Sequence, residues 1–220
     1  MNHAARMARF DESDLYVVIT GAFCTGRSPE DVLAAALDAG VKLVQFREKD
    51  ISDLDKFRLA ERFRRSAADA GALLIVDDRV DIALAVDADG VHLGAEDLPV
   101  DAARRIAPEL IIGASSHSLD EALAAQAQGA SYVNIGPVFD TATKAVSTGT
   151  VGPDLITEVK PHLRIPFTTM GGIKAHNIGE VLRRGARHVA VVTAVTAADN
   201  VTQAAAGLRQ AILDARAPRQ

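Results

Sequence analysis

The chain has little cysteine, no surplus of positive charge and no long apolar run. Cys24 is the single cysteine among 220 residues, which excludes a disulfide framework and a zinc site built from several cysteines. Lys and Arg number 24 against 29 Asp and Glu, a net charge of −5, which argues against a nucleic-acid binder that relies on bulk positive charge. No apolar run approaches the roughly 20 residues that cross a bilayer. We therefore expect a cytoplasmic protein with neither a nucleic-acid nor a membrane partner.

The sequence also shows no sign of a domain boundary. No Ser/Pro-rich linker or low-complexity block interrupts the chain, and its length suits one domain of ordinary size. The first segment has basic residues but no apolar core behind them, unlike a secretory signal. We predict one domain over residues 1–220, with short flexible tails at about 1–12 and 217–220. Whether it forms a homo-oligomer stays open.

A short apolar run, a small-residue turn and an amphipathic stretch alternate along the chain. Eight runs rich in β-branched residues are predicted strands, and the clearest helices are expected at 28–40, 52–71, 118–130 and 200–217. The expected strands are 15–20, 42–48, 72–78, 90–94, 110–116, 132–137, 165–171 and 188–195. Strict alternation predicts a parallel sheet covered by helices, and eight even units favour an α/β fold with a single (β/α)8 TIM barrel. An open doubly wound sheet is the alternative, but no G-x-G-x-x-G follows the first strand.

The second expected strand carries cations at its end. By the period of two, one face holds Val41, Leu43, Gln45, Arg47 and Lys49. With that face in the lumen, the apolar residues fill the barrel and the polar ones rise to its mouth. Two cations and an amide there suit an anionic ligand. The alternative is a surface strand whose cations extend into solvent.

Carboxylates follow the third and fourth expected strands. Asp77 and Asp78 end the third, and Asp97 comes soon after the fourth. Asp78 and Asp97 are oxygen donors that could share a Mg²⁺ ion beside a phosphate. Both also stand where a helix N-cap is expected, so capping is an equal alternative.

Three later segments suit phosphate oxygens. The long segment 136–152 holds the potential donors Thr141, Thr143 and Lys144, and is either a lid or a disordered surface loop. Gly171 and Gly172 end the seventh strand, where loop amides of such barrels commonly bind a phosphate. Together with the end of the eighth strand, they predict a second phosphate site, separate from the cationic one.

The end of the fifth strand is less specific. Ser115 and Ser116 are small donors at the predicted mouth, but Ser116 or Ser118 could cap the next helix. No G-x-S-x-G or Ser-His-Asp assembly is evident. The other histidines, His92 and His188 among them, show no metal spacing and are interpreted as structural or surface residues.

Several of these segments, taken in order, resemble one enzyme family. VQFREK (44–49), DDRVDIALAVDADGVHLGAEDLP (77–99), IIGASSHS (111–118), GPVFDTATK (136–144) and GGI (171–173) closely resemble thiamine-phosphate synthase. The resemblance runs from about residue 14 to 199. The related thiazole tautomerases share the barrel and much of this pattern.

The resemblance implies a transferase that joins 4-amino-2-methyl-5-pyrimidinylmethyl diphosphate to thiazole ethyl phosphate, with Mg²⁺ as cofactor. It implies that Asp78 and Asp97 hold the metal and that Gln45 contacts the pyrimidine, with Ser115 near the reacting centre. The implied diphosphate ligands are Arg47, Lys49, Thr141, Thr143 and Lys144. The implied thiazole phosphate ligands are Gly172, Val192 and Thr193, mainly through backbone groups.

Four positions depart from the usual synthase pattern: Phe46 stands for Leu, Asp77 for Asn, Ala95 for Gln and Asp140 for Pro. Asp77 matters most, because it puts a negative charge where the family presents an amide to substrate. It could weaken diphosphate binding, tighten Mg²⁺ or mark a changed substrate.

Three hypotheses follow for the function. The synthase is favoured, because two carboxylates and the cations exceed what a monophosphate isomerase needs. A thiazole tautomerase, or a related barrel with an altered substrate, gains from His117 as a potential proton-transfer base. A non-catalytic ligand-binding barrel is the third.

Overall fold

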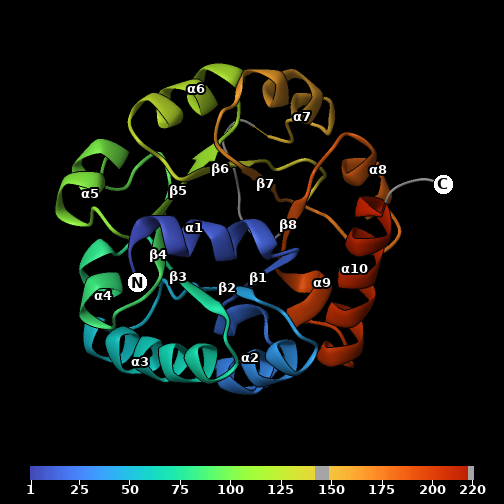
Figure 1. Cartoon of the computed structure of the whole chain (residues 1–220). Coiled ribbons are helices and arrows are strands. Elements are labelled where there is room, and N and C mark those ends of the chain that lie inside the picture. The colour runs from blue at the N-terminus through green and yellow to red at the C-terminus, as the bar shows by residue number, and fades with distance from the viewer. Residues whose placement is uncertain (142–148, 218–220) are drawn as a thin grey trace.

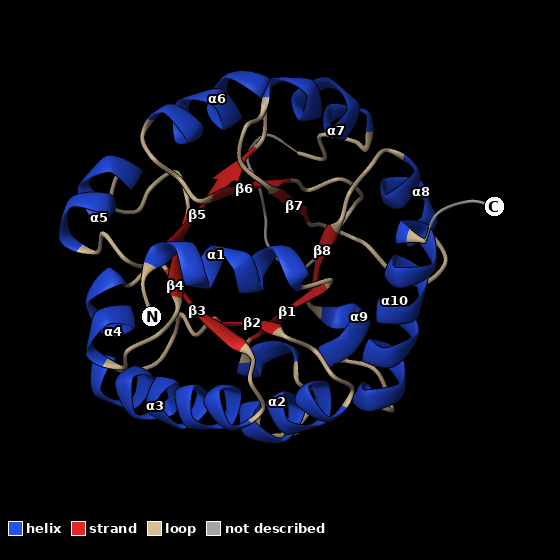
Figure 2. Ribbon diagram, viewed as in Figure 1, coloured by secondary structure: helices blue, strands red, loops and turns tan. Residues whose placement is uncertain are grey.

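The computed structural model describes residues 1–141 and 149–217. Eight parallel strands pair in sequence order, and β1 pairs with β8 to close the barrel. The predicted eight-stranded closed barrel is confirmed, and the open sheet is excluded. Figure 1 shows the helices as an outer ring around the strands, and Figure 2 separates the two layers by colour. The strands are β1 Leu15–Ile19, β2 Leu43–Phe46, β3 Leu73–Asp77, β4 Gly90–Leu93, β5 Ile111–Ser116, β6 Tyr132–Ile135, β7 Phe167–Thr169 and β8 His188–Val191.

Several helices begin at a residue whose side chain caps the first turn. Ser28, Ser52, Ser118 and Asn200 each accept a hydrogen bond from a backbone N–H of the first turn, as N-cap side chains do. The Ser118 cap settles which serine begins the helix after β5. The α-helices are α1 His3–Glu12, α2 Pro29–Asp38, α3 Asp53–Asp69, α4 Val80–Ala85, α5 Val100–Ile106, α6 Leu119–Ala127, α7 Asp154–Val159, α8 Ile178–Arg183, α9 Thr193–Thr196 and α10 Val201–Arg216. Two 3₁₀ turns, η1 Gly21–Phe23 and η2 Lys160–His162, complete the described elements.

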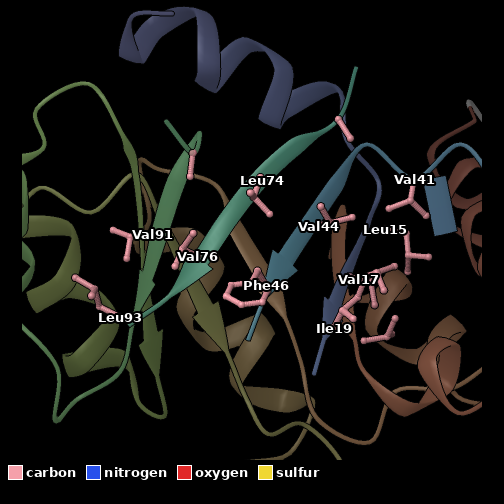
Figure 3. Packing of buried hydrophobic residues seen from close by; sticks show 14 of the residues in the cluster. Leu15, Val17, Ile19, Val41, Val44, Phe46, Leu74, Val76, Val91 and Leu93 are labelled. Atoms are coloured by element: carbon pink, nitrogen blue, oxygen red, sulfur yellow. The ribbon is translucent and has the colours of Figure 1, made fainter. Parts of the chain in front are cut away.

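Buried side chains form two layers. The larger layer packs the outer face of the strands against the helices, and Figure 3 shows part of it, from Leu15 to Leu93. The smaller layer fills the lumen and includes Tyr16, Leu43, Ile75 and Tyr132. Alternation along each strand assigns residues to the two layers. Leu43 lies in the lumen as predicted, but Val41 belongs to the outer layer, because it precedes β2 and does not continue the alternation.

The first residues are not a flexible tail. Residues 3–12 form α1, which Figure 1 shows lying across one end of the barrel. His3 contacts Ser131 at 2.9 Å, and Arg6 donates to the carbonyl of Glu109, so α1 covers the N-terminal ends of the strands. Phe10 is fully buried in the lumen layer. The predicted tail at 1–12 is therefore wrong, since this helix closes the barrel. Of the other predicted tail, only Ala217 lies within the described residues, as the C-cap of α10.

No helix in the described part of the chain is long and apolar enough to span a membrane.

Candidate active site

One pocket opens at the carboxyl ends of the strands, where barrels of this kind carry their chemistry. Its cavity volume is about 290 Å³. Residues from strands on opposite sides of the barrel line it, and many of them were singled out in the sequence: Gln45, Arg47, Asp77, Ser115, His117, Asp140, Thr141, Gly171, Gly172, Val192 and Thr193. The fold thus brings residues of both predicted sites, Arg47 and Gly172 among them, to one cavity. Lys49, Asp78 and Asp97 are not among its lining residues, but Lys49 contacts both Asp78 and the lining residue Asp77.

A charged cluster forms the wall at β2, β3 and the loop after β4. Lys49 Nζ lies 3.0 Å from Asp77 Oδ2 and also contacts Asp78. Arg47 Nε lies 3.5 Å from the same Asp77 oxygen. Burial raises the pKa of Asp77 to about 6, with the nearby Asp78 charge adding to the shift. Arg47 and Lys49 thus share Asp77 as a partner, and an anionic ligand would compete with this carboxylate for both cations.

Asp78 and Asp97 come together at the edge of this cluster. Each of these two carboxyl groups affects the pKa of the other. Burial raises the pKa of Asp97, despite the hydrogen bond that its Oδ2 accepts from Gly94 N at 2.6 Å. Burial of Asp78 works in the same direction, but its interactions with Lys49 and Asp97 outweigh burial and lower its pKa. Carboxylates that must share a proton or a cation in this way are suited to a divalent ion.

The alternative role of these two residues as helix caps is wrong. The N-cap of α4 is Arg79 and that of α5 is Pro99, and neither helix has a side-chain cap. Asp78 instead adopts a left-handed backbone with φ of 59°, which Asp tolerates better than most residues. This backbone conformation is strained, and strained residues of this kind are found most often at ligand-binding and catalytic sites.

The residues present fit a Mg²⁺ site in which the protein supplies two carboxylates. Among the described residues, no group of three or more His, Cys, Asp or Glu could hold a metal ion. Mg²⁺ is often bound by one or two carboxylates, with substrate phosphate and water completing its shell. The linked pair Asp78 and Asp97 supplies that number of ligands beside the cations.

The opposite wall is mostly backbone. Gly171 and Gly172 have φ of 103° and 62°, a region that glycine adopts without strain. A Cβ on Gly172 would lie 2.5 Å from the Asp140 carbonyl oxygen, so this position has no room for a side chain. The end of β8, which pairs with β7, and the start of α9 line the same part of the pocket. The predicted strand at 188–195 is shorter than expected, since Thr193 begins α9.

The segment after β6 extends along the loop after β7. Val138 N donates to the Met170 carbonyl and Phe139 N to the Gly171 carbonyl. Asp140 and Thr141 therefore reach the pocket. Thr143 and Lys144 lie outside the described residues.

Sequence interpretation missed part of the site. His92, Asn134, Met170 and Lys174 also line the pocket. His92 is 8% exposed, and its ring bonds Tyr132 and Ser115. The period of two along β4 carried a signal, because Gly90 and His92 share the face that turns to the lumen.

Comparisons with known proteins bear on what this pocket does. A family model described as thiamine monophosphate synthase matches residues 15–195. The chain belongs to the thiamine monophosphate synthase family. The resemblance drawn from the motifs is confirmed, and a member of this family is an enzyme of the transferase class.

Named relatives cover nearly the whole chain. The thiamine-phosphate synthase of Chloroflexus aurantiacus is 46% identical over 195 residues, 89% of this chain and 90% of that protein. The synthase of Chlorobium luteolum is 47% identical over 182 residues, 82% of this chain and 86% of that one. A solved structure, thiamine phosphate pyrophosphorylase from Pyrococcus furiosus, superposes with a TM-score of 0.88 at 37% identity, covering 96% of this chain and 100% of that chain.

The departures from the family's usual pattern now separate by position. Phe46 is buried and packs on Phe63 of α3, with ring centroids 5.0 Å apart, so it belongs to the outer layer. Ala95 is exposed. Asp77 and Asp140 line the pocket, and only these two place a new charge where a family substrate would bind.

Proposed function

We propose that this protein is a thiamine-phosphate synthase. It would couple 4-amino-2-methyl-5-pyrimidinylmethyl diphosphate with thiazole ethyl phosphate to give thiamine phosphate and diphosphate. The observation that carries the proposal is one pocket lined by residues of both anion-binding sets, Arg47 after β2 and the glycine cradle after β7. Two phosphorylated substrates that must meet need two such sites facing one cavity.

The pyrimidine substrate would lie along the charged wall. Arg47 and Lys49 would bind its diphosphate, together with Thr141, Thr143 and Lys144 from the segment after β6. Asp78 and Asp97 would hold Mg²⁺, which supplies charge neutralisation to the leaving diphosphate when bound. Gln45 would contact the pyrimidine ring, and Ser115 would lie close to the reacting methylene.

The thiazole substrate would be held at the opposite wall. The backbone N–H groups near Gly172, Val192 and Thr193 would bind its phosphate. This arrangement leaves the thiazole ring facing the charged wall across the cavity, since the two sets of residues line one pocket.

The reaction breaks one bond and makes one. The C–O bond between the pyrimidine methylene and the diphosphate breaks, and its electron pair leaves with the diphosphate. The lone pair of the thiazole nitrogen then forms the C–N bond to the methylene carbon. The protein lowers the barrier by presenting preorganised cations to the developing negative charge, whose stabilisation is worth most in a secluded pocket.

One observation favours a second candidate, the thiazole tautomerase. His117 lines the pocket, and its Nδ1 lies 3.0 Å from Glu121 Oε2. A histidine oriented by a carboxylate is a competent proton-transfer base.

Kinetics of two variants separate the candidates. Arg47→Met should lower kcat for thiamine phosphate formation by at least about a hundredfold, since it removes a charge from the leaving group. His117→Gln should leave this rate within about threefold. If the wild-type protein forms no thiamine phosphate but interconverts thiazole tautomers, and His117→Gln abolishes that interconversion, the protein is a tautomerase.

A further inference from the structure

A continuous chain of side-chain hydrogen bonds runs below the pocket floor. Gln45 Nε2 lies 2.7 Å from the Tyr16 hydroxyl, and that hydroxyl lies 3.1 Å from the Tyr132 hydroxyl. The Tyr132 oxygen lies 2.9 Å from His92 Nδ1, and His92 Nε2 lies 3.1 Å from Ser115 Oγ. The chain thus begins and ends on residues that line the pocket, Gln45 and Ser115. It uses both tyrosines of the sequence.

The sheet register makes this contact possible. Gly113 on β5 pairs with His92 on β4 and with Tyr132 on β6. A Cβ on Gly113 would lie 2.2 Å from Tyr132 Cζ and 2.4 Å from its hydroxyl oxygen. Because Gly113 has no side chain, the Tyr132 ring can lie over β5. Its hydroxyl thereby reaches the imidazole of His92 on the next strand.

The direction of the hydrogen bonds follows from the first donor. The Gln45 amide nitrogen only donates, so the Tyr16 oxygen accepts from it. The buried Tyr16 hydrogen then needs an acceptor, and among the described residues the Tyr132 oxygen is its partner. Tyr132 in turn donates to His92 Nδ1. A neutral imidazole that accepts at Nδ1 carries its hydrogen on Nε2, and this hydrogen is donated to Ser115.

Both phenols remain protonated donors under ordinary conditions. Burial raises the pKa of Tyr16 and also that of Tyr132, well above the usual value for tyrosine. Neither hydroxyl is exposed to solvent, since Tyr16 is 1% exposed and Tyr132 is fully buried. Each hydroxyl hydrogen therefore has its partner within the protein.

We propose that Tyr132 is a positioning residue that fixes the Nε2–H tautomer of His92, so that Ser115 presents its hydroxyl hydrogen to the pocket. Ser115 Oγ accepts from His92, and its own hydrogen is directed away from the imidazole. The reverse order would leave Ser115 donating to His92 and offering only a lone pair to a ligand. This chain of hydrogen bonds, from here on called the relay, therefore decides whether Ser115 is a donor or an acceptor toward substrate.

The consequence for catalysis rests on the proposed synthase function. A donor at Ser115 suits a lone pair of the pyrimidine diphosphate, either a ring nitrogen or a diphosphate oxygen. Tyr132 touches no ligand in this scheme and acts only through His92 and Ser115.

Nitrogen-15 NMR of the imidazoles tests the tautomer directly, without substrate. The His92 signals are assigned by their loss in His92→Gln. The wild-type protein should show a hydrogen on Nε2 and none on Nδ1. Tyr132→Phe should give a measurable Nδ1–H population, while the matched Tyr16→Phe should keep Nε2–H because Tyr132 still donates. A wild-type His92 with Nδ1–H, or a Tyr132→Phe protein with an unchanged tautomer, would overturn the proposal.

A double-mutant cycle tests the route to Ser115. Tyr132→Phe should lower kcat/KM for the pyrimidine diphosphate by about tenfold, the scale of one lost hydrogen bond. In the Ser115→Ala background the same change should have no further effect. Two independent, additive losses would contradict a role through Ser115. If the wild-type protein forms no thiamine phosphate, the proposed function fails, while the NMR result still decides the tautomer.

Gly113→Ala provides a variant in which both tyrosines remain. The added methyl should displace the Tyr132 hydroxyl and reproduce the Nδ1–H signal of Tyr132→Phe. Near-ultraviolet circular dichroism checks that the barrel core remains folded. A folded Gly113→Ala protein with the wild-type tautomer would count against the relay.

Discussion

Lys49 forms an ion pair with Asp77 of the pocket wall, with Nζ 3.0 Å from Oδ2. Arg47 Nε lies 3.5 Å from the same oxygen. The carboxylate therefore draws on both cations that the proposed diphosphate needs. The synthase pattern that the chain resembles usually has Asn at this position, and an amide would carry no charge to pair with these cations.

Asp77→Asn should lower KM for the pyrimidine diphosphate by about tenfold. Removing the carboxylate frees Lys49 and Arg47 for the diphosphate, and about 1.4 kcal/mol is tenfold in affinity. Steady-state kinetics at saturating thiazole phosphate measure the change. Asp11→Asn, an exposed acid on α1 at the other end of the barrel, is the control. A higher KM in Asp77→Asn would show that the carboxylate itself contacts substrate.

Asp97→Asn should abolish Mg²⁺ binding without destabilising the protein. Its carboxylate is linked to Asp78 and caps no helix, so its loss relieves repulsion in the metal-free protein. Calorimetric titration of Mg²⁺ in the presence of inorganic diphosphate gives the affinity, and thermal unfolding gives the stability. The neighbouring exposed Glu96→Gln serves as control. Retained Mg²⁺ binding with a Tm lower by several degrees would indicate a structural role.

Gly172→Ala should raise KM for the thiazole phosphate by tenfold or more. The new Cβ would meet Asp140 O at 2.5 Å and Phe139 Cβ at 2.8 Å, and φ of 62° strains any residue with a side chain. The segment after β6 must then move away from the cradle. Gly207→Ala in α10 is the matched control, because nothing lies within 4 Å of its Cβ and Ala favours a helix. Equal KM values in both variants would exclude the cradle at Gly172.

The free energy of unfolding should decrease at acidic pH because of His188. Burial, with Arg216 and Arg187 adding to it, lowers the pKa of His188 from 6.5 to about 4. Between these values the unfolded chain takes up a proton that the folded protein refuses, so the free energy of unfolding decreases as pH falls from 6.5 to 4. The full loss is about 3 kcal/mol, at about 1.4 kcal/mol for each pH unit.

Urea unfolding of His188→Gln across this pH range measures that contribution. The variant should show a smaller decrease than the wild-type protein, and the exposed His176→Gln should not. His188 packs against Phe10 with ring centroids 4.9 Å apart, so the acid-induced loss should begin where α1 closes the barrel. An identical slope in all three proteins would contradict the role of His188.

The features that depend on local sequence pattern, namely the strands, the closed barrel and the residues at the strand ends, could be predicted from the sequence. Strands such as β1 and β3 are short, mostly apolar runs, and eight such runs in alternation with helices favoured a closed barrel. The motif residues lie at strand ends, so the alternation alone was enough to place Gln45, Arg47, Asp77 and Ser115 at one mouth of the barrel. Shared motifs then identified the family.

What the sequence missed depends on contacts between distant segments. Phe10 stands among polar and small residues, and its burial exists only because the barrel end receives it. The link from Tyr132 to His92 depends on the register of three strands around Gly113. Asp78 looked like a helix cap because a local pattern does not reveal a φ of 59°.

The most direct test of the synthase assignment is product analysis by mass spectrometry with both proposed substrates and Mg²⁺. The account predicts thiamine phosphate and diphosphate in equal amounts, with neither formed when the thiazole phosphate is omitted or Mg²⁺ is chelated. Interconversion of thiazole tautomers that persists in chelator, with no thiamine phosphate at any enzyme concentration, would contradict it.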